Sequence, residues 1–324
     1  MLAGVGVAMA FVVVVLGAYT RLSDSGLGCP DWPGCYGFLV VPHAAHDVST
    51  AQARFPDAPL EAHKAWPEMV HRYFATGLGL VIVLCALVAV RARGCDLPLR
   101  LPLLLVALVV LQGAFGAWTV TLKLWPQVVT AHLLGGMTTL ALLWLLLARV
   151  RNAPPMAHGG YRAHAALALA VVIAQIALGG WTTSNYAALA CPDLPTCQGR
   201  WWPAMDFRHG FAIAQSVGPN YLGGLLEGEA RVAIHMAHRV GAVAVVLVVG
   251  SLAVRLLRAP QWRAYGAVLG GLVLVQFTLG VSNVAFALPL AVATAHNATA
   301  ALLLLACVSV NYRSFSSERS ELRA

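Results

Sequence analysis

Charged residues are scarce in this chain: Asp, Glu, Lys and Arg make up only 10% of its 324 residues, whereas 59% are hydrophobic. Soluble domains carry roughly a quarter charged residues, and a mean hydropathy of +0.75 lies far outside their range. The composition excludes an ordinary soluble protein and indicates an all-α integral membrane protein that crosses the bilayer several times.

Apolar stretches long enough to cross a hydrocarbon core of about 30 Å as helices occur repeatedly. We expect eight transmembrane helices, over residues 3–21, 68–90, 101–121, 127–149, 163–183, 233–255, 263–285 and 289–311. The first stretch lacks the small-residue cleavage site of a secretory signal, so it is expected to be retained as a helix. An Arg- and Ser-rich import presequence is also lacking, which favours a bacterial cytoplasmic (inner) membrane over an organelle.

Acidic residues are nearly absent from one predicted side of the membrane. Three short connections and the C-terminal tail hold twelve basic residues and only three acidic ones. Because Lys and Arg concentrate in cytoplasmic loops, both termini are predicted to be cytoplasmic, and the long loops 22–67 and 184–232 external. The net charge of +8 follows from this topology and gives no reason to expect nucleic acid. The twelve are Arg91, Arg93, Arg100, Arg149, Arg151, Arg162, Arg255, Arg258, Arg263, Arg313, Arg319 and Arg323.

Several short blocks of the sequence occur twice, in the same order. The blocks are 29–37 and 191–199, 71–72 and 238–239, 112–116 and 276–280, and 130–132 and 294–296. Each half contains four predicted helices, and an even number makes the repeats parallel. We therefore expect two halves, 1–155 and 156–324, that form two four-helix bundles related by a pseudo-two-fold axis along the membrane normal.

Four cysteines, Cys29, Cys35, Cys191 and Cys197, lie in the predicted external loops, where disulfides persist. Within each loop the two cysteines are six residues apart and separated by two prolines, so each loop could close on itself. The pairs are interpreted either as structural crosslinks or as thiols that cycle with a disulfide. Metal binding is disfavoured because nearby Asp and His residues do not repeat with ligand spacing.

Four histidines lie just inside predicted helices: His71, His132, His238 and His296. Pro67, Pro126 and Pro289 suit first-turn positions, which puts these histidines near the outer leaflet. Ionisable residues inside a membrane are costly and are functional candidates by default. Two equivalent pairs suit two bis-histidine haem sites, whereas zinc is disfavoured because no third ligand accompanies either pair. Other histidines are expected in solvated loops: His43, His46, His63, His158, His164 and His209.

Residues beside these histidines suggest how a cofactor would be held. Arg72 and Arg239 each follow a histidine at the membrane edge, where they would pair with haem propionates or extend to the interface. Glu68 precedes His71 by three residues, whereas His235 occupies that place before His238, so we expect chemistry at the first site and electron storage or relay at the second. Glycines that would let a flat macrocycle approach the backbone are Gly77, Gly79, Gly135, Gly136 and Gly241.

These motifs resemble the haem A synthase family over nearly the whole chain. The resemblance rests on TRLSDSGLGCPDWP at 20–33, EMVHR at 68–72, the His132 segment, His238-Arg239 and His296. It implies an eight-helix enzyme that oxidises the C8 methyl of haem O to the formyl group of haem A for cytochrome oxidase. It also implies haem O between His71 and His132 with Glu68 beside it, and a resident haem b between His238 and His296.

The resemblance extends to the cysteines and to the partners. Cys29/Cys35 and Cys191/Cys197 match cysteine pairs of family members, and the first of these is functional in them. The implied partners are haem O, haem O synthase, cytochrome oxidase assembly factors, a membrane electron acceptor and a second copy of the chain in a homo-oligomer. Two axial histidines leave no iron position for oxygen, so either one histidine is displaced or electrons are withdrawn from the ring.

An alternative is a di-haem b-type carrier that passes electrons between a quinol and an external acceptor. Such carriers stack haems near opposite membrane faces, whereas all four histidines are predicted near one face. A transporter built of parallel repeats would show interrupted helices or midplane charges, and neither is evident. The enzyme is therefore preferred.

The topology predicts that Cys29 and Cys35, once reduced, react with a membrane-impermeant thiol reagent in intact spheroplasts. Labelling that needed cell lysis would reverse the predicted orientation.

Overall fold

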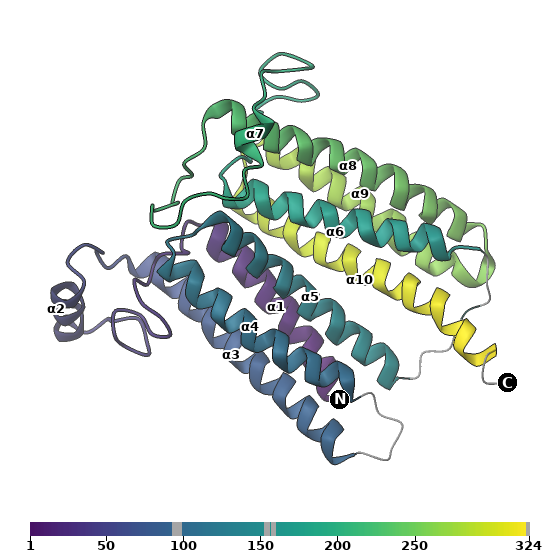
Figure 1. The fold of residues 1–324 in the computed structure, drawn as a ribbon, viewed down its shortest axis with the longest axis horizontal. Coiled ribbons are helices and arrows are strands. Elements are labelled where there is room, and N and C mark those ends of the chain that lie inside the picture. Colours follow the sequence, from purple (N-terminus) through teal and green to yellow (C-terminus); the bar gives the residue numbers. More distant parts are fainter. Residues whose placement is uncertain (93–98, 152–155, 157–159, 322–324) are drawn as a thin grey trace.

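The computed structural model describes residues 1–92, 99–151, 156 and 160–321, and within them eight helices are long and apolar enough to cross a membrane (Figure 1). All eight predicted spans are thus confirmed. The helices are α1 (Leu2–Leu22), α3 (Ala62–Arg91), α4 (Arg100–Thr121), α5 (Pro126–Val150), α6 (Arg162–Ser184), α8 (Gly228–Leu257), α9 (Arg263–Ala285) and α10 (Leu290–Glu321). Parts of the sequence-based predictions fall outside the described residues, namely Arg93, residue 155 at the predicted domain boundary, His158 and Arg323.

The start of α3 differs from the prediction. Pro67 was expected in the first turn, but α3 begins five residues earlier, at Ala62. The extra turn is held by tertiary contacts, because a Cβ on Gly28 would lie only 2.5 Å from the backbone carbon of Lys64. The Thr20 hydroxyl also donates to the Pro67 carbonyl (3.2 Å). Pro126 does occupy the first turn of α5.

Each half of the chain arranges its four long helices in the same cyclic order of contacts. In the first half α1 and α4 each contact α3 and α5, and in the second α6 and α9 each contact α8 and α10. The halves meet through α1, α5, α6 and α10, which lie in the middle of Figure 1 with α3 and α4 on one side and α8 and α9 on the other. The diagonal pairs α3/α5 and α8/α10 thus face across the interior of their own halves.

The interior is one apolar cluster to which all eight long helices contribute. Lipid is as apolar as leucine, so helix association in a membrane depends on close packing and on interhelical hydrogen bonds. Bonds that join the halves include Trp144 Nε1 donating to Ser309 Oγ (2.7 Å) and the hydrogen bond between the Thr130 and Ser184 hydroxyls (3.0 Å). The halves are therefore joined by specific polar contacts as well as by packing.

The sequence repeat is also a repeat of local backbone structure. Left-handed residues recur at the same offsets as the sequence blocks: Asp24 and Tyr186 (φ 53° and 54°), Leu124 and Leu288 (φ 61° and 63°). Asp24 and Tyr186 also touch, because the Tyr186 hydroxyl donates to Asp24 Oδ1 (3.3 Å). Equivalent turns of the two halves thus meet at the interface.

Two short helices, α2 (Ala45–Arg54) and α7 (Phe207–Gly210), lie in the long loops at one end of the long helices (Figure 1). The structure corrects the expectation that the remaining histidines lie in loops. His46 is in α2, His63 in α3 and His209 in α7, although all three are exposed. His164 lies in α6, is partly buried and contacts the Val248 carbonyl (2.9 Å). Helix turns outside an apolar run leave no hydrophobic signal, which explains the errors at His46, His63 and His209, whereas His164 lies inside the predicted span 163–183.

Close helix packing generates a test within α9. A Cβ on Gly266 would lie 2.7 Å from the Leu257 nitrogen and 2.8 Å from the Ala253 oxygen, both backbone atoms of α8. Gly266→Ala should destabilise the protein by about 1–3 kcal/mol, as overpacking does, and lower its Tm. Gly271→Ala is the matched control, because nothing lies within 4 Å of its Cβ. Equal Tm values for the two variants would contradict this packing.

Candidate functional site

The first pair of predicted histidines meets inside the first half. His71 on α3 and His132 on α5 have ring centroids 6.4 Å apart and ring planes at 85°. Two imidazoles bound on opposite sides of one metal, at ~2 Å each, place their centroids roughly 6 Å apart. The separation of the rings therefore fits two axial ligands of a single metal centre.

The second pair occupies the equivalent diagonal in the other half. His238 lies on α8 and His296 on α10, the diagonal pair of helices of the second half. Each predicted pair therefore lies on facing helices of one half, and its role in binding haem stays a prediction.

Each of the four imidazoles packs against a glycine on a neighbouring helix. A Cβ built on that glycine would lie 2.9–3.6 Å from the histidine Cε1, so a larger side chain would displace the ring. The pairs are Gly17 with His71, Gly116 with His132, Gly179 with His238 and Gly280 with His296.

These glycines were missed by the sequence analysis, which selected others. Gly135 lies against the Gln112 side chain and Gly241 against Gln175, whereas Gly77, Gly79 and Gly136 pack near apolar side chains. For two of the four glycines the sequence did contain a signal, because Gly116 and Gly280 end the repeated blocks 112–116 and 276–280.

Several ring nitrogens of these histidines are orphaned. Nδ1 of His71, His132 and His296 is buried without a hydrogen-bond partner, although buried polar groups are almost always paired. Among the described residues no group of three His, Cys, Asp or Glu side chains could hold a metal ion. Two-histidine sites with unsatisfied nitrogens fit haem iron, since a porphyrin supplies its other four ligands.

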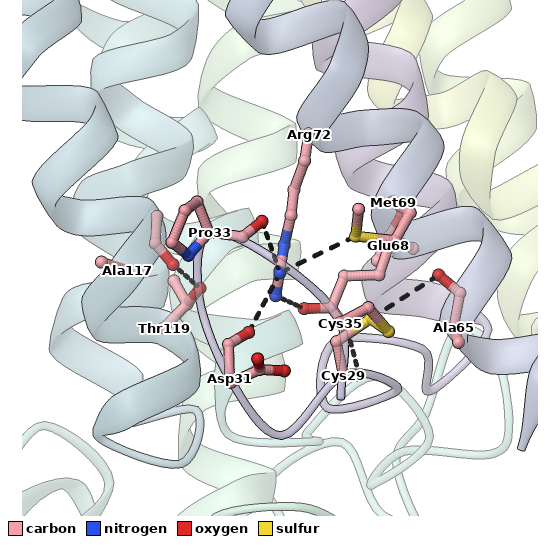
Figure 2. A network of polar contacts seen from close by, with 12 residues as sticks. Cys29, Asp31, Pro33, Cys35, Ala65, Glu68, Met69, Arg72, Ala117 and Thr119 are labelled. Carbon is pink, nitrogen blue, oxygen red and sulfur yellow. Dashed lines mark hydrogen bonds and ion pairs between the residues drawn. A yellow bond between two sulfur atoms is a disulfide. The ribbon is translucent and has the colours of Figure 1, made fainter. Parts of the chain in front are cut away.

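The first long loop, which contains Cys29 and Cys35, is bound to α3 through Glu68 and Arg72 (Figure 2). Glu68, only 5% exposed, accepts a hydrogen bond from the Cys29 amide at Oε2 (3.0 Å) and pairs with Arg72 through Oε1. The Arg72 guanidinium also donates to the carbonyls of Asp31 (3.0 Å), Pro33 (3.3 Å) and Gly34. One turn of α3 therefore orders this loop and places a buried carboxylate one turn from His71.

The second long loop, which contains Cys191 and Cys197, is held in the same way but lacks the carboxylate. Arg239 donates to the carbonyls of Thr196 (2.8 Å), Asp193 (2.8 Å) and Cys191 (3.0 Å). His235 replaces Glu68, is equally buried and contacts the Ala187 carbonyl through Nδ1 (3.0 Å). The two halves therefore differ in a buried ionisable side chain, a carboxylate at Glu68 and an imidazole at His235.

Both predicted cysteine pairs are disulfides, Cys29–Cys35 and Cys191–Cys197, with Cα atoms 4.8 and 4.6 Å apart. Each loop is closed further by an aspartate of the repeated Cys-Pro-Asp. Asp31 accepts from the amides of Tyr36 (2.6 Å) and Gly37 (2.8 Å). Hydrogen bonds from the Thr196 hydroxyl and from the amides of Gly199 and Gln198 keep the pKa of Asp193 below its usual value. Each loop is thus a small rigid unit. The sequence alone left open whether its two cysteines form a structural disulfide.

The sequence-predicted site residues fall into two separate groups. The first contains Glu68, His71, Arg72, His132 and the Cys29–Cys35 loop, and the second contains His238, Arg239, His296 and the Cys191–Cys197 loop. Both arginines contact loop carbonyls, so their pairing with propionates stays a prediction.

Known proteins similar to this chain match it over almost its whole length. The family model COX15-CtaA, described as cytochrome oxidase assembly protein, matches residues 1–308. A heme A synthase of Shewanella oneidensis is 47% identical over 305 residues, which cover 93% of this chain and 92% of that protein. Heme A synthases of Caulobacter vibrioides (29% identical; 94% and 93% covered) and Methylobacterium radiotolerans (31%; 93% and 86%) are also similar.

The arginine contacts predict local effects of two reciprocal variants. Hydrogen bonds of charged groups contribute about 1.5–3 kcal/mol each, so Arg72→Leu should accelerate hydrogen exchange of the Cys35 and Phe38 amides at least ~10-fold. These two residues bond each other's backbone, as Cys197 and Arg200 do in the second loop. Arg239→Leu should affect only the second loop, so each variant is the control for the other. Equal acceleration of both loops by one variant would contradict the assignment.

Proposed function

This chain belongs to the COX15-CtaA family of cytochrome oxidase assembly proteins, and from that membership we propose how its two histidine pairs divide the work. The family activity is that of a haem A synthase, a multi-pass membrane oxidoreductase that converts haem O into haem A. The proposal concerns which residues hold each haem and which group assists the oxidation.

We propose that haem O binds between His71 and His132 and that a resident haem b binds between His238 and His296. The main support is the single buried carboxylate: Glu68 lies one turn from His71, whereas His235 stands at the equivalent place beside His238. Two sites of equal function would be expected to share this residue.

Oxidation of the C8 methyl of haem O to a formyl group takes up one water and releases four protons and four electrons. A resident haem b, when bound, supplies a one-electron carrier, and a membrane electron acceptor takes the electrons onward. Glu68, whose oxygens are held in place by the Cys29 amide and Arg72, is the buried ionisable group beside His71 and is proposed to accept these protons one at a time and pass each on.

The glycines behind the histidines set the position of the ligands. Gly17 and Gly116 allow the His71 and His132 rings to lie back against α1 and α4, which leaves the interior between them for a flat substrate. Arg72 orders the first loop above this space, and we propose that its guanidinium or that of Arg239 also faces the propionate edge of a haem.

We propose that the two halves are four-helix bundles related by a pseudo-two-fold axis along the membrane normal, with both termini cytoplasmic. The support is the identical cyclic order of helix contacts and the meeting of the equivalent residues Asp24 and Tyr186. Disulfides persist outside the cytoplasm, so the end with the two cysteine loops is assigned to the outside. Haem O synthase and cytochrome oxidase assembly factors are the proposed protein partners.

Extraction of haems from the purified protein, with chromatography and mass spectrometry, tests the division of labour. We expect haem b together with haem O or haem A. Two equivalents of haem b, unchanged when haem O is supplied, would instead support the di-haem electron carrier.

Two variants assign the haems to the halves. His238→Ala should remove haem b, because one axial ligand of the resident site is lost. Glu68→Ala should retain haem b but stop the conversion of haem O. His209→Ala, an exposed histidine outside both sites, is the control. Equal loss of haem b in His238→Ala and Glu68→Ala would refute the assignment.

A further inference from the structure

The two histidine pairs differ in a residue behind the first histidine of each pair. In the second half α6 carries Gln175 beside His238, and at the equivalent position of α1, 162 residues earlier, stands Val13. The same offset relates Gly17 and Gly179, which back the two histidines. The neighbourhoods are therefore equivalent except that one has an amide and the other an aliphatic side chain.

Gln175 is held tightly against His238. Its Nε2 lies 3.1 Å from His238 Nδ1 and 2.9 Å from the His238 carbonyl oxygen. On the other side a Cβ on Gly241 would lie 2.1 Å from Gln175 Oε1, so this glycine makes room for the amide. Gln175 thus bridges α6 and α8 at the ring of a proposed haem ligand.

The amide of Gln175 can serve either tautomer of His238. Oε1 is buried and has no partner, and which end of an amide faces a ring nitrogen is assigned from the hydrogen-bond network. A histidine that binds metal through Nε2 carries its proton on Nδ1 and needs an acceptor there. With Oε1 turned to Nδ1, Gln175 is that acceptor, and the turn gives up the bond from Nε2 to the His238 carbonyl oxygen.

No equivalent support exists behind His71. Its ring lies against the Val13 backbone carbonyl, yet Nδ1 does not reach hydrogen-bonding geometry and has no partner. The Val13 side chain has no polar atom to offer. His71 is therefore backed by glycine and an aliphatic side chain, without a side-chain hydrogen bond to orient its ring.

Resting on the proposed function, we infer that Gln175 is a positioning residue that makes His238 a permanent haem ligand, and that Val13 leaves His71 an exchangeable one. An outer partner of a metal-bound histidine changes metal affinity by about 10- to 100-fold. The substrate site must exchange its haem at every turnover, whereas the resident site must not. A side-chain hydrogen bond behind the first histidine of one half, and none behind that of the other, would thus help to distinguish the two sites.

Reciprocal variants, Gln175→Val and Val13→Gln, test this inference. Haem b should leave Gln175→Val about 10- to 100-fold faster than wild type, measured as transfer to excess apomyoglobin. The reduction potential of the remaining haem b should rise, because an Nδ1–H bond makes the imidazole a stronger electron donor to the iron. Val13→Gln should slow the release of haem O or haem A by a similar factor.

Gln175→Glu is the conservative variant, because a carboxylate also accepts from Nδ1–H. It should retain haem b and hold the potential at or below that of wild type, which a purely structural role of Gln175 would not predict. If Gln175→Val fails to fold, Gln175→Glu and Val13→Gln still test the inference.

Unchanged haem b release and potential in Gln175→Val, or unchanged substrate release in Val13→Gln, would overturn the inference. A failure of the proposed function is distinguishable, because haem b would then persist in His238→Ala. Loss of haem b in His238→Ala together with normal retention in Gln175→Val would refute only the role of Gln175.

Discussion

The burial of four imidazoles inside apolar helix pairs is the constraint on which the rest of this structure depends. A ring of this size fits between membrane helices only where the facing backbone has no side chain, and each ring is met by a glycine on the next helix. Because hydrocarbon offers no hydrogen bonds, the buried ring nitrogens without protein partners are the main support for the proposed haem ligation.

The loops follow from the same helices. In each half the arginine after the first histidine extends out of the bundle and gathers the carbonyls of a disulfide-closed loop, which its aspartate closes further. The loop in return stabilises the helix end, and this explains why α3 starts five residues before the position that Pro67 suggested. Each site is thus joined to its loop by hydrogen bonds. In the first half, a structural change in the loop would act directly on the Glu68 carboxylate through the Cys29 amide.

Duplication supplied two equal sites, and a few substitutions made them unequal. Glu68 against His235 changes the proton chemistry beside the ring, and Val13 against Gln175 changes the support behind it. Both differences point the same way: the first half has an acid and a loosely supported ligand, and the second half has neither. This division agrees with the proposal that one haem is changed and the other is kept.

The sequence by itself determined the membrane class, the eight spans, the repeat and the four histidines, because apolar length and repeated blocks are local properties of a chain. It also singled out Glu68 by comparing His71 with His238. Only the tertiary structure decided which glycines back the rings, that Arg72 and Arg239 contact loop carbonyls, and that Gln175 meets His238. Those contacts join different helices and loops, between residues 16 to 63 positions apart, and they depend on the rotation and crossing of helices whose apolar surfaces look alike in lipid.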